Sequence, residues 1–151
     1  MLEKFIPFIL LPIIGFGVWH YLKKKNNLTA LKKRTFFVAL CAFSLTELGR
    51  SFYRPYIYQN HIDDYFIADT LGNSFGTVTA IFMIITLSGS GTHRDWKIVF
   101  IIIGGLFVYE LINLTGKVSI DVNDMIATMV FGFISALIYL VILRKYDNKV
   151  N

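Results

Sequence analysis

The residues most able to do chemistry in this chain are carboxylates that interrupt long apolar runs. Glu110 and Asp124 lie on either side of a short polar break between two such runs. Glu47 and Asp69 flank a longer break upstream. An ionisable side chain within an apolar span is costly unless it is paired or faces water, so these four carboxylates mark a candidate functional site. Such groups can bind a cation or a polar head group, and a pair of them can serve as acid and base.

The composition is that of an integral membrane protein. The 151 residues are 55% hydrophobic and 16% aromatic, with a mean hydropathy of +0.58, whereas soluble domains are roughly 45–50% apolar. The net charge of +5 comes from basic residues in short runs beside apolar segments, a distribution that membrane topology requires. We therefore expect one membrane domain over residues 1–151 and no nucleic-acid partner. Cys41 has no partner in the chain, which excludes a disulfide framework and a cysteine metal site.

Apolar segments predict an all-α bundle of about five transmembrane helices. The first covers residues 5–22, and the other four form two αα-hairpins in parallel orientation, over residues 35–88 and 98–143. Residues 23–34 are rich in Lys and Arg and contain no acidic residue, so the positive-inside rule places them in the cytoplasm. The N-terminus is then outside and the C-terminus cytoplasmic.

The connection between the second and third spans carries a weaker candidate site. Pro55 is expected to end the second span, which leaves residues 54–64 as an external loop. His61, Asp63 and Asp64 offer ligands for zinc or manganese, but no second histidine lies nearby, so a solvated loop or an N-cap for the third span is preferred. The tyrosines in and beside this loop are typical of a membrane-surface aromatic belt: Tyr53, Tyr56, Tyr58 and Tyr65.

The two hairpins carry their acidic residues at matching positions. Glu47 and Glu110 each fall 12 positions after the predicted start of an outward helix, which is about 18 Å along the axis and past the bilayer midplane. Three residues later, on the same helix face, comes a polar residue, Arg50 or Asn113.

The returning helices match at an offset of 55 residues. Asp69 corresponds to Asp124, and Asn73 to Thr128, on a narrow stripe of polar and small residues. Its small members include Gly72, Gly76, Ala80, Ala127, Gly132 and Ser135. Close helix packing is the ordinary explanation of such a stripe, and homo-oligomerisation would suit the same faces. The carboxylates differ, because the topology brings all four to the outer half of the membrane, where they can converge on one cavity.

The polar break of the second hairpin resembles the signature of the VanZ-like family of small polytopic membrane proteins. That signature has a glutamate and a glutamine three apart, a basic residue in a short external loop, two aspartates three apart, and then an asparagine and glycines. Glu110 and Asn113 stand for the first pair, and Lys117 stands for the basic residue. Asp121 and Asp124 stand for the two aspartates.

The sequence departs from the family pattern at three positions. Asn113 replaces the glutamine, Lys117 replaces the more usual arginine, and Thr128 replaces the asparagine, although Asn73 keeps that amide in the first hairpin. The resemblance covers the C-terminal third of the chain. It implies a bacterial inner-membrane protein of the cell envelope, associated in the family's namesake with low-level teicoplanin resistance, and it implies no particular reaction.

Three functions remain open at this point. We prefer a non-enzymatic envelope protein that binds a membrane lipid, or a lipid-linked or cell-wall-derived ligand, in an outward acidic cavity. The cavity would be lined by Glu47, Arg50, Asp69, Asn73, Glu110, Asn113 and Asp124, to which the resemblance adds Asp121. The alternatives are an enzyme that uses paired glutamates on an outer-leaflet lipid, and a small ion or proton conductor. We expect no cofactor or bound metal, since no such motif is present. A structural explanation is an internal Glu47–Arg50 pair with two helix-capping aspartates.

Overall fold

The computed structural model describes residues 5–114 and 122–147, and within them the chain is helical and contains no strand. The elements in chain order are α1 (Ile6–Lys24), α2 (Ala30–Leu48), the π-helical turn η2 (Gly49–Tyr53), α3 (Arg54–Gln59), α4 (Ile67–Ser88), α5 (His93–Leu114) and α6 (Val122–Asp147). The predicted all-α class is confirmed.

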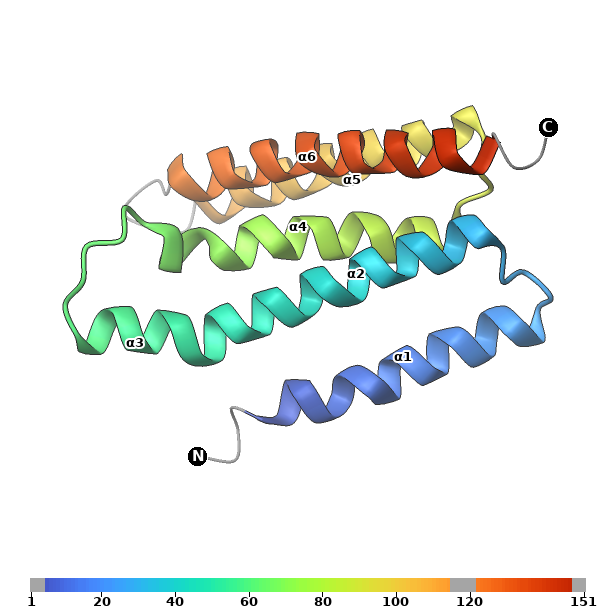
Figure 1. Ribbon diagram of the computed structural model, residues 1–151. Helices are drawn as coiled ribbons and strands as arrows, with labels where there is room; N and C mark the ends of the chain where they lie inside the picture. Colours follow the sequence, from blue (N-terminus) through green and yellow to red (C-terminus); the bar gives the residue numbers. More distant parts are fainter. Residues whose placement is uncertain (1–4, 115–121, 148–151) are drawn as a thin grey trace.

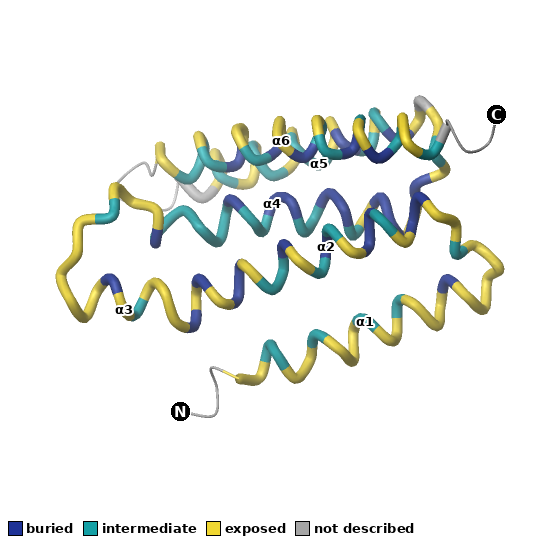
Figure 2. The backbone as a smooth tube through the Cα atoms, in the orientation of Figure 1, coloured by how far each residue is buried: buried dark blue, intermediate teal, exposed yellow. Residues whose placement is uncertain are grey.

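The long helices lie side by side and alternate in direction (Figure 1). Helix α4 is central, because it packs against α2 on one side and against α5 and α6 on the other. Helix α1 packs on α2 and is otherwise mostly exposed, as Figure 2 shows. The end of α2, the start of α4, the end of α5 and the start of α6 lie together, and we call this the Glu47 end. The opposite end, where α5 begins, is called the Asp95 end.

Among the described residues, three helices are long and apolar enough to cross a membrane: α1, α4 and α6. Their outward faces carry large apolar side chains, among them Ile13, Phe16 and Phe133, which a bilayer would cover. Helices α2 and α5 have similar lengths but bear charged residues near both ends. The fold is that of a helical membrane protein.

The interior differs between the two ends. From the middle of the bundle toward the Asp95 end it is an apolar core, which includes Ala39, Val78, Ile81, Phe82, Ile85, Val99 and Tyr139. Toward the Glu47 end the buried side chains are largely polar: Thr46, Glu47, Ser51, Ser74, Thr77 and Thr128. Hydrophobic packing therefore stabilises the middle of the bundle, and buried polar residues lie toward the Asp95 end as well: Lys32, Thr35, Thr86 and Asp95.

The prediction that Pro55 ends the second span is wrong. The helix runs on from α2 through η2 into α3, and the Arg54 N–H donates to the carbonyl of Gly49, five residues back. A proline ring clashes with the carbonyl four residues earlier in an α-helix and leaves it without a donor, so a widened π turn before Pro55 accommodates the ring. The turn also sits close to α4, because a Cβ on Gly49 would lie 2.8 Å from Leu71 Cδ1.

Two helices begin earlier than the hydropathy pattern predicts. Helix α2 begins at Ala30, since the Thr29 hydroxyl caps it by accepting a 3.3 Å hydrogen bond from the Lys32 N–H. Helix α5 likewise begins at His93, before its apolar run. The basic residues of positions 32–34 therefore lie on a helix and have fixed directions.

Candidate functional site

The four predicted carboxylates come from four helices and lie at the Glu47 end of the bundle. Glu47 is the eighteenth residue of α2 and Glu110 the eighteenth of α5. Asp69 is the third residue of α4 and Asp124 the third of α6. Helices α2 and α5 end where α4 and α6 begin (Figure 1), so matched positions in the sequence lie at the same end of the bundle, although α2 and α5 are not packed against each other.

Glu47 is the most buried of the four. Only 7% of the residue is exposed, and its carboxylate pairs with Arg50 at 3.7 Å, as the spacing of three predicts. The Arg50 side chain is 67% exposed, so water screens most of the attraction that it supplies. A buried carboxylate with a distant, solvated partner is expensive to keep for folding alone.

Buried hydroxyl groups lie in the interior of the bundle toward the Glu47 end. Thr46 donates to the carbonyl of Ala42 at 3.0 Å, and Thr77 donates to the carbonyl of Asn73 at 2.6 Å. Each hydroxyl thereby uses its proton within its own helix and keeps an oxygen that can accept. The Glu47 end is consequently rich in hydrogen-bond acceptors, which suits a ligand that carries donors or positive charge.

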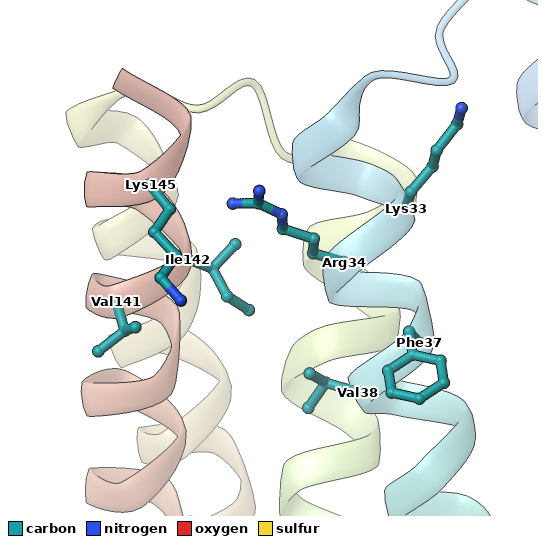
Figure 3. A pocket seen from close by; sticks show the side chains of 7 residues that line it. All are labelled: Lys33, Arg34, Phe37, Val38, Val141, Ile142 and Lys145. Atoms are coloured by element: carbon teal, nitrogen blue, oxygen red, sulfur yellow. The ribbon is translucent and has the colours of Figure 1, made fainter. Parts of the chain in front are cut away.

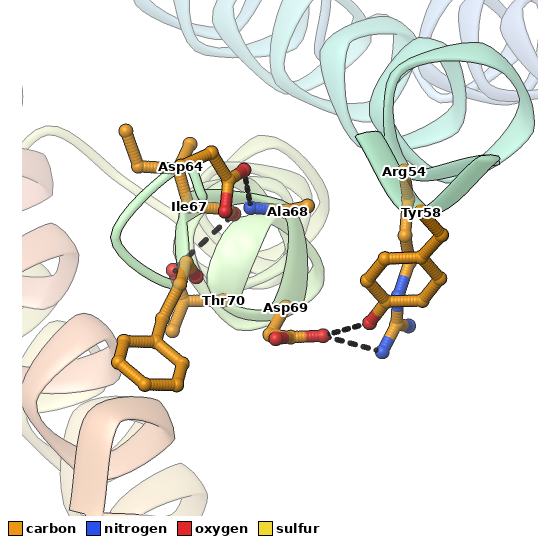
Figure 4. A network of polar contacts seen from close by, with 8 residues as sticks. Arg54, Tyr58, Asp64, Ile67, Ala68, Asp69 and Thr70 are labelled. Atoms are coloured by element: carbon orange, nitrogen blue, oxygen red, sulfur yellow. Dashed lines mark hydrogen bonds and ion pairs between the residues drawn. The ribbon is translucent and has the colours of Figure 1, made fainter. Parts of the chain in front are cut away.

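Asp69 is held by two residues that the sequence analysis did not include in the site. The Arg54 Nη2 atom lies 2.9 Å from Asp69 Oδ1, and the Tyr58 hydroxyl donates to the same oxygen (Figure 4). Arg54 Nε also donates to the Tyr58 oxygen at 3.1 Å. Arg54 and Tyr58 are four residues apart, which puts them on one face only if the helix continues through Pro55. Because Pro55 was expected to end the helix, the sequence did not predict that Arg54 and Tyr58 share a helix face.

Two acidic residues of the loop near His61, Asp63 and Asp64, accept hydrogen bonds from backbone N–H groups. Asp64 Oδ2 accepts a 2.7 Å hydrogen bond from the Ala68 N–H at the start of α4 (Figure 4). Asp63 Oδ1 accepts one of 3.1 Å from the Tyr65 N–H. Asp64 therefore satisfies a backbone N–H in the first turn of α4, but the residue at the N-cap position is Phe66, which makes no side-chain capping bond. In the described part of the chain, no three His, Cys, Asp or Glu residues are grouped to hold a metal ion.

The remaining predicted residues are less fully placed. Asn73, Glu110 and Asp124 are half-buried on α4, α5 and α6. Asp121 and Lys117 lie outside the described residues, as does the side chain of Asn113.

The glycine stripe divides into two kinds of position. At Gly132 a Cβ would lie 3.0 Å from Ile103 Cγ1, so this glycine lets α5 and α6 pack closely, as predicted. At Gly72 and Gly76 a Cβ would meet nothing within 4 Å. Close packing against the described residues therefore does not explain these two half-buried glycines.

Two hollows open near the Glu47 end. One, of about 670 Å³, lies between η2 and α4 and is lined mainly by apolar and aromatic side chains, including Leu48, Phe52, Tyr53 and Phe75. The other, of about 260 Å³, lies between α4 and α6 and includes Thr70, Ser74 and Asn123. The four carboxylates are not among the residues that line either hollow.

A second buried carboxylate, at the Asp95 end, was missed by the sequence analysis. Asp95 is fully buried and accepts hydrogen bonds from Ser90 N at 3.0 Å, Gly91 N at 2.7 Å and the Tyr139 hydroxyl at 2.6 Å. Burial alone would raise the pKa of Asp95, but these bonds outweigh it and hold the pKa below its usual value. The signal was the Thr92-x-x-Asp95 spacing, which is that of a capping box at a helix start.

Lys32 occupies the corresponding position of α2, three residues after its cap. It is almost fully buried, and its Nζ donates to the carbonyl of Leu87 at 3.4 Å, near the C-terminus of α4. Burial lowers the pKa of Lys32, and the charge of Asp95 partly restores it. Beside it the Thr86 hydroxyl donates to the Thr35 hydroxyl at 2.9 Å. This end of the bundle is thus fastened by internal partners.

The fold and these contacts define a helical membrane protein with polar clusters at both ends of its bundle. Comparison with models of known families, with curated proteins and with solved structures finds no match for this chain.

Proposed function

We propose that this protein is a VanZ-like, five-span protein of the bacterial inner membrane that binds a polar or lipid-linked ligand at the Glu47 end. In this proposal the Glu47 end faces outside, the N-terminus is outside, and the C-terminus is cytoplasmic. The distribution of Lys and Arg supports the orientation, since residues 23–34 and the end of α6 lie at the Asp95 end.

The observation that carries the proposal is the burial of Glu47, to which the described residues supply one counter-ion, the solvated Arg50 at 3.7 Å. The hydroxyls of Thr46 and Thr77 donate to carbonyls of their own helices, so neither gives its proton to the carboxylate. A ligand with an ammonium, amide or hydroxyl donor would supply what the fold does not. Ligand binding therefore accounts for a costly group that stability alone does not require.

The neighbouring hollow favours a ligand with an apolar portion. Leu48 and Gly49 follow Glu47 directly in the chain and line the 670 Å³ hollow together with aromatic side chains of η2. A head group at Glu47 and a chain or ring in this hollow would describe a lipid-linked or cell-wall-derived molecule. The resemblance to VanZ-like proteins supports the same setting and would connect the protein with tolerance of glycopeptides such as teicoplanin.

The topology can be tested by cysteine labelling in a Cys41→Ser background. Gln59→Cys at the end of α3 should react with a membrane-impermeant maleimide added outside intact cells. Lys25→Cys, in the turn after α1, should react only after lysis. Labelling of position 59 from the cytoplasm alone would reverse the orientation and remove the outward-facing site.

Ligand binding can be tested with Glu47→Gln and Glu110→Gln, which keep the side-chain size and remove the charge. Cells that depend on this protein for teicoplanin tolerance should lose that tolerance with either variant, while membrane levels and the unfolding temperature stay near wild type. Asp63→Asn, at an exposed position of the same end, is the matched control and should keep full tolerance. Full tolerance in both glutamine variants would refute the proposal.

A further inference from the structure

A groove that differs in chemistry from the two hollows of the Glu47 end lies between α2 and α6 near the Asp95 end (Figure 3). Its volume is about 420 Å³. Its wall is apolar, formed by Phe37 and Val38 of α2 and by Val141 and Ile142 of α6. Its rim is basic, formed by Lys33, Arg34 and Lys145.

The basic groups of the rim come from different helices. Figure 3 shows the Arg34 guanidinium extending from α2 toward α6, and the Lys145 side chain running along α6 with its ammonium at the edge that faces α2. Lys33 points away from them, and its Nζ lies 5.8 Å from the centre of the Trp19 ring of α1. The ion pairs among the described residues are Glu47–Arg50 and Arg54–Asp69, so no described acid neutralises Arg34 or Lys145. Two like charges facing one groove repel each other until an anion lies between them.

We propose that this groove binds an anionic phospholipid of the cytoplasmic leaflet. The phosphate would sit between Arg34 and Lys145, where the guanidinium can donate two parallel hydrogen bonds and the ammonium acts as a point charge. An acyl chain would run along Phe37, Val38 and Val141 toward the middle of the bundle. Basic pockets between transmembrane helices on the cytoplasmic side suit such head groups.

The position along the helices favours a lipid over a free anion or a second protein copy. Arg34 is the fifth residue of α2, and Lys145 lies in the last turn of α6, so both occupy the level expected for head groups. The apolar wall continues from that level toward the bilayer core, as one lipid molecule requires. A second copy would have to place an acidic group between the two cations, and most acidic side chains that the structure describes lie at the Glu47 end. The inference rests on the membrane placement proposed above and is independent of ligand binding at the Glu47 end.

Native mass spectrometry of the full chain tests the inference, with phosphatidylglycerol and phosphatidylcholine of identical acyl chains titrated in separate arms. The wild type should retain one phosphatidylglycerol at concentrations that leave phosphatidylcholine unbound. The double variant Arg34→Gln/Lys145→Gln should bind phosphatidylglycerol roughly 25-fold more weakly, since each basic residue near an anionic surface contributes about fivefold. The charge-matched control Lys24→Gln/Arg144→Gln, at exposed positions outside the groove, should bind like the wild type.

A third variant tests the apolar wall of the groove separately from its two basic side chains. Val141 is exposed and lines the groove, so Val141→Trp should fill the apolar wall and weaken retention while both cations remain. Equal retention by the double variant and its control would overturn the inference. So would equal binding of phosphatidylcholine, complete displacement by inorganic phosphate, or a dimer that disappears in the double variant. The expected loss in the double variant would support it whether or not Glu47→Gln changes teicoplanin tolerance.

Discussion

The two ends of this bundle each bury a carboxylate, and they treat it in opposite ways. At the Asp95 end, two backbone N–H groups and a tyrosine hydroxyl surround Asp95 at 2.6 to 3.0 Å. At the Glu47 end, Glu47 is paired with a largely exposed arginine at 3.7 Å. Asp95 thus receives short hydrogen bonds from the fold itself, whereas Glu47 receives one longer ion pair from an exposed side chain.

The difference shows that position in a membrane helix does not by itself make an acidic residue functional. Asp95 has enough charge-assisted hydrogen bonds to offset its desolvation, so its effect should be on folding. Glu47 lacks that compensation, so removing its charge should cost the fold little. Five expected outcomes test this contrast, beginning with the largest.

Asp95→Asn should give the largest loss of stability. An amide presents one oxygen and an NH₂ group to a cluster made of donors, so at least one buried donor loses its acceptor. We expect the free energy of unfolding to fall by about 3 kcal/mol, because hydrogen bonds to charged groups contribute more than neutral ones. Thermal unfolding in detergent measures this. Tyr139→Phe, which removes one donor and leaves the acceptor, is the control and should cost about 1 kcal/mol. Equal losses in the two variants would contradict the account.

Gly89→Ala should have the next largest effect. A Cβ at Gly89 would lie 2.5 Å from the backbone oxygen of Ile85, and 3.2 Å from Asp95 Oδ2, so the turn that supplies donors to Asp95 must shift. The expected loss is about 2 kcal/mol. Gly104→Ala is the matched control, since nothing lies within 4 Å of a Cβ there, and helix propensity makes it neutral or slightly stabilising. A tolerated Gly89→Ala would show that the turn is adaptable.

The pH dependence should follow from the lowered pKa of Asp95. A depressed folded-state pKa means that the stabilisation is present above the unfolded value, about 3.9, and is lost as the pH falls through the folded value. The wild type and Asp95→Asn should therefore differ most at neutral pH and converge as the pH falls below about 4. Unfolding midpoints measured from pH 7 to pH 3 would show this. A constant difference would exclude ionised Asp95 as the cause.

Asp69→Asn should have a small effect. The Arg54 and Asp69 side chains are both substantially exposed, and pairs of this kind contribute about 0.5–1 kcal/mol. Arg54→Gln should lower the free energy of unfolding by a similar amount. The double variant should lower it no further than either single variant, because all three lose the same ion pair. Additive losses in the double variant would mean that the two residues act separately.

Hydropathy predicted the helical class and the approximate positions of the long helices, because long apolar runs leave a strong signal. The alignment of Glu47 with Glu110 along their helices followed from sequence spacing as well. The course of the chain at Pro55 was not predicted, because proline was expected to end the helix, whereas a π turn accommodates its ring and lets the helix continue. Because the π turn was not predicted, the contact of Arg54 with Asp69 was not predicted either.

The Asp95 cluster shows a different limit of the sequence. The capping spacing before α5 was visible, but Tyr139 lies 44 residues away from Asp95, and only helix packing brings its hydroxyl to the carboxylate. The groove at Arg34 likewise requires α2 and α6 to lie together near their charged ends. Long-range contacts of this kind leave no periodic signal in the chain.

The most direct test of the account compares the unfolding free energy of Glu47→Gln with that of Asp95→Asn in the same lipid–detergent mixture. Glu47→Gln should leave stability unchanged or raise it by up to about 1 kcal/mol, because it removes a buried charge whose partner is solvated. Asp95→Asn should lose about 3 kcal/mol under the same conditions. A comparable loss at Glu47 would mean that this carboxylate serves the fold, and would contradict a binding role for the Glu47 end.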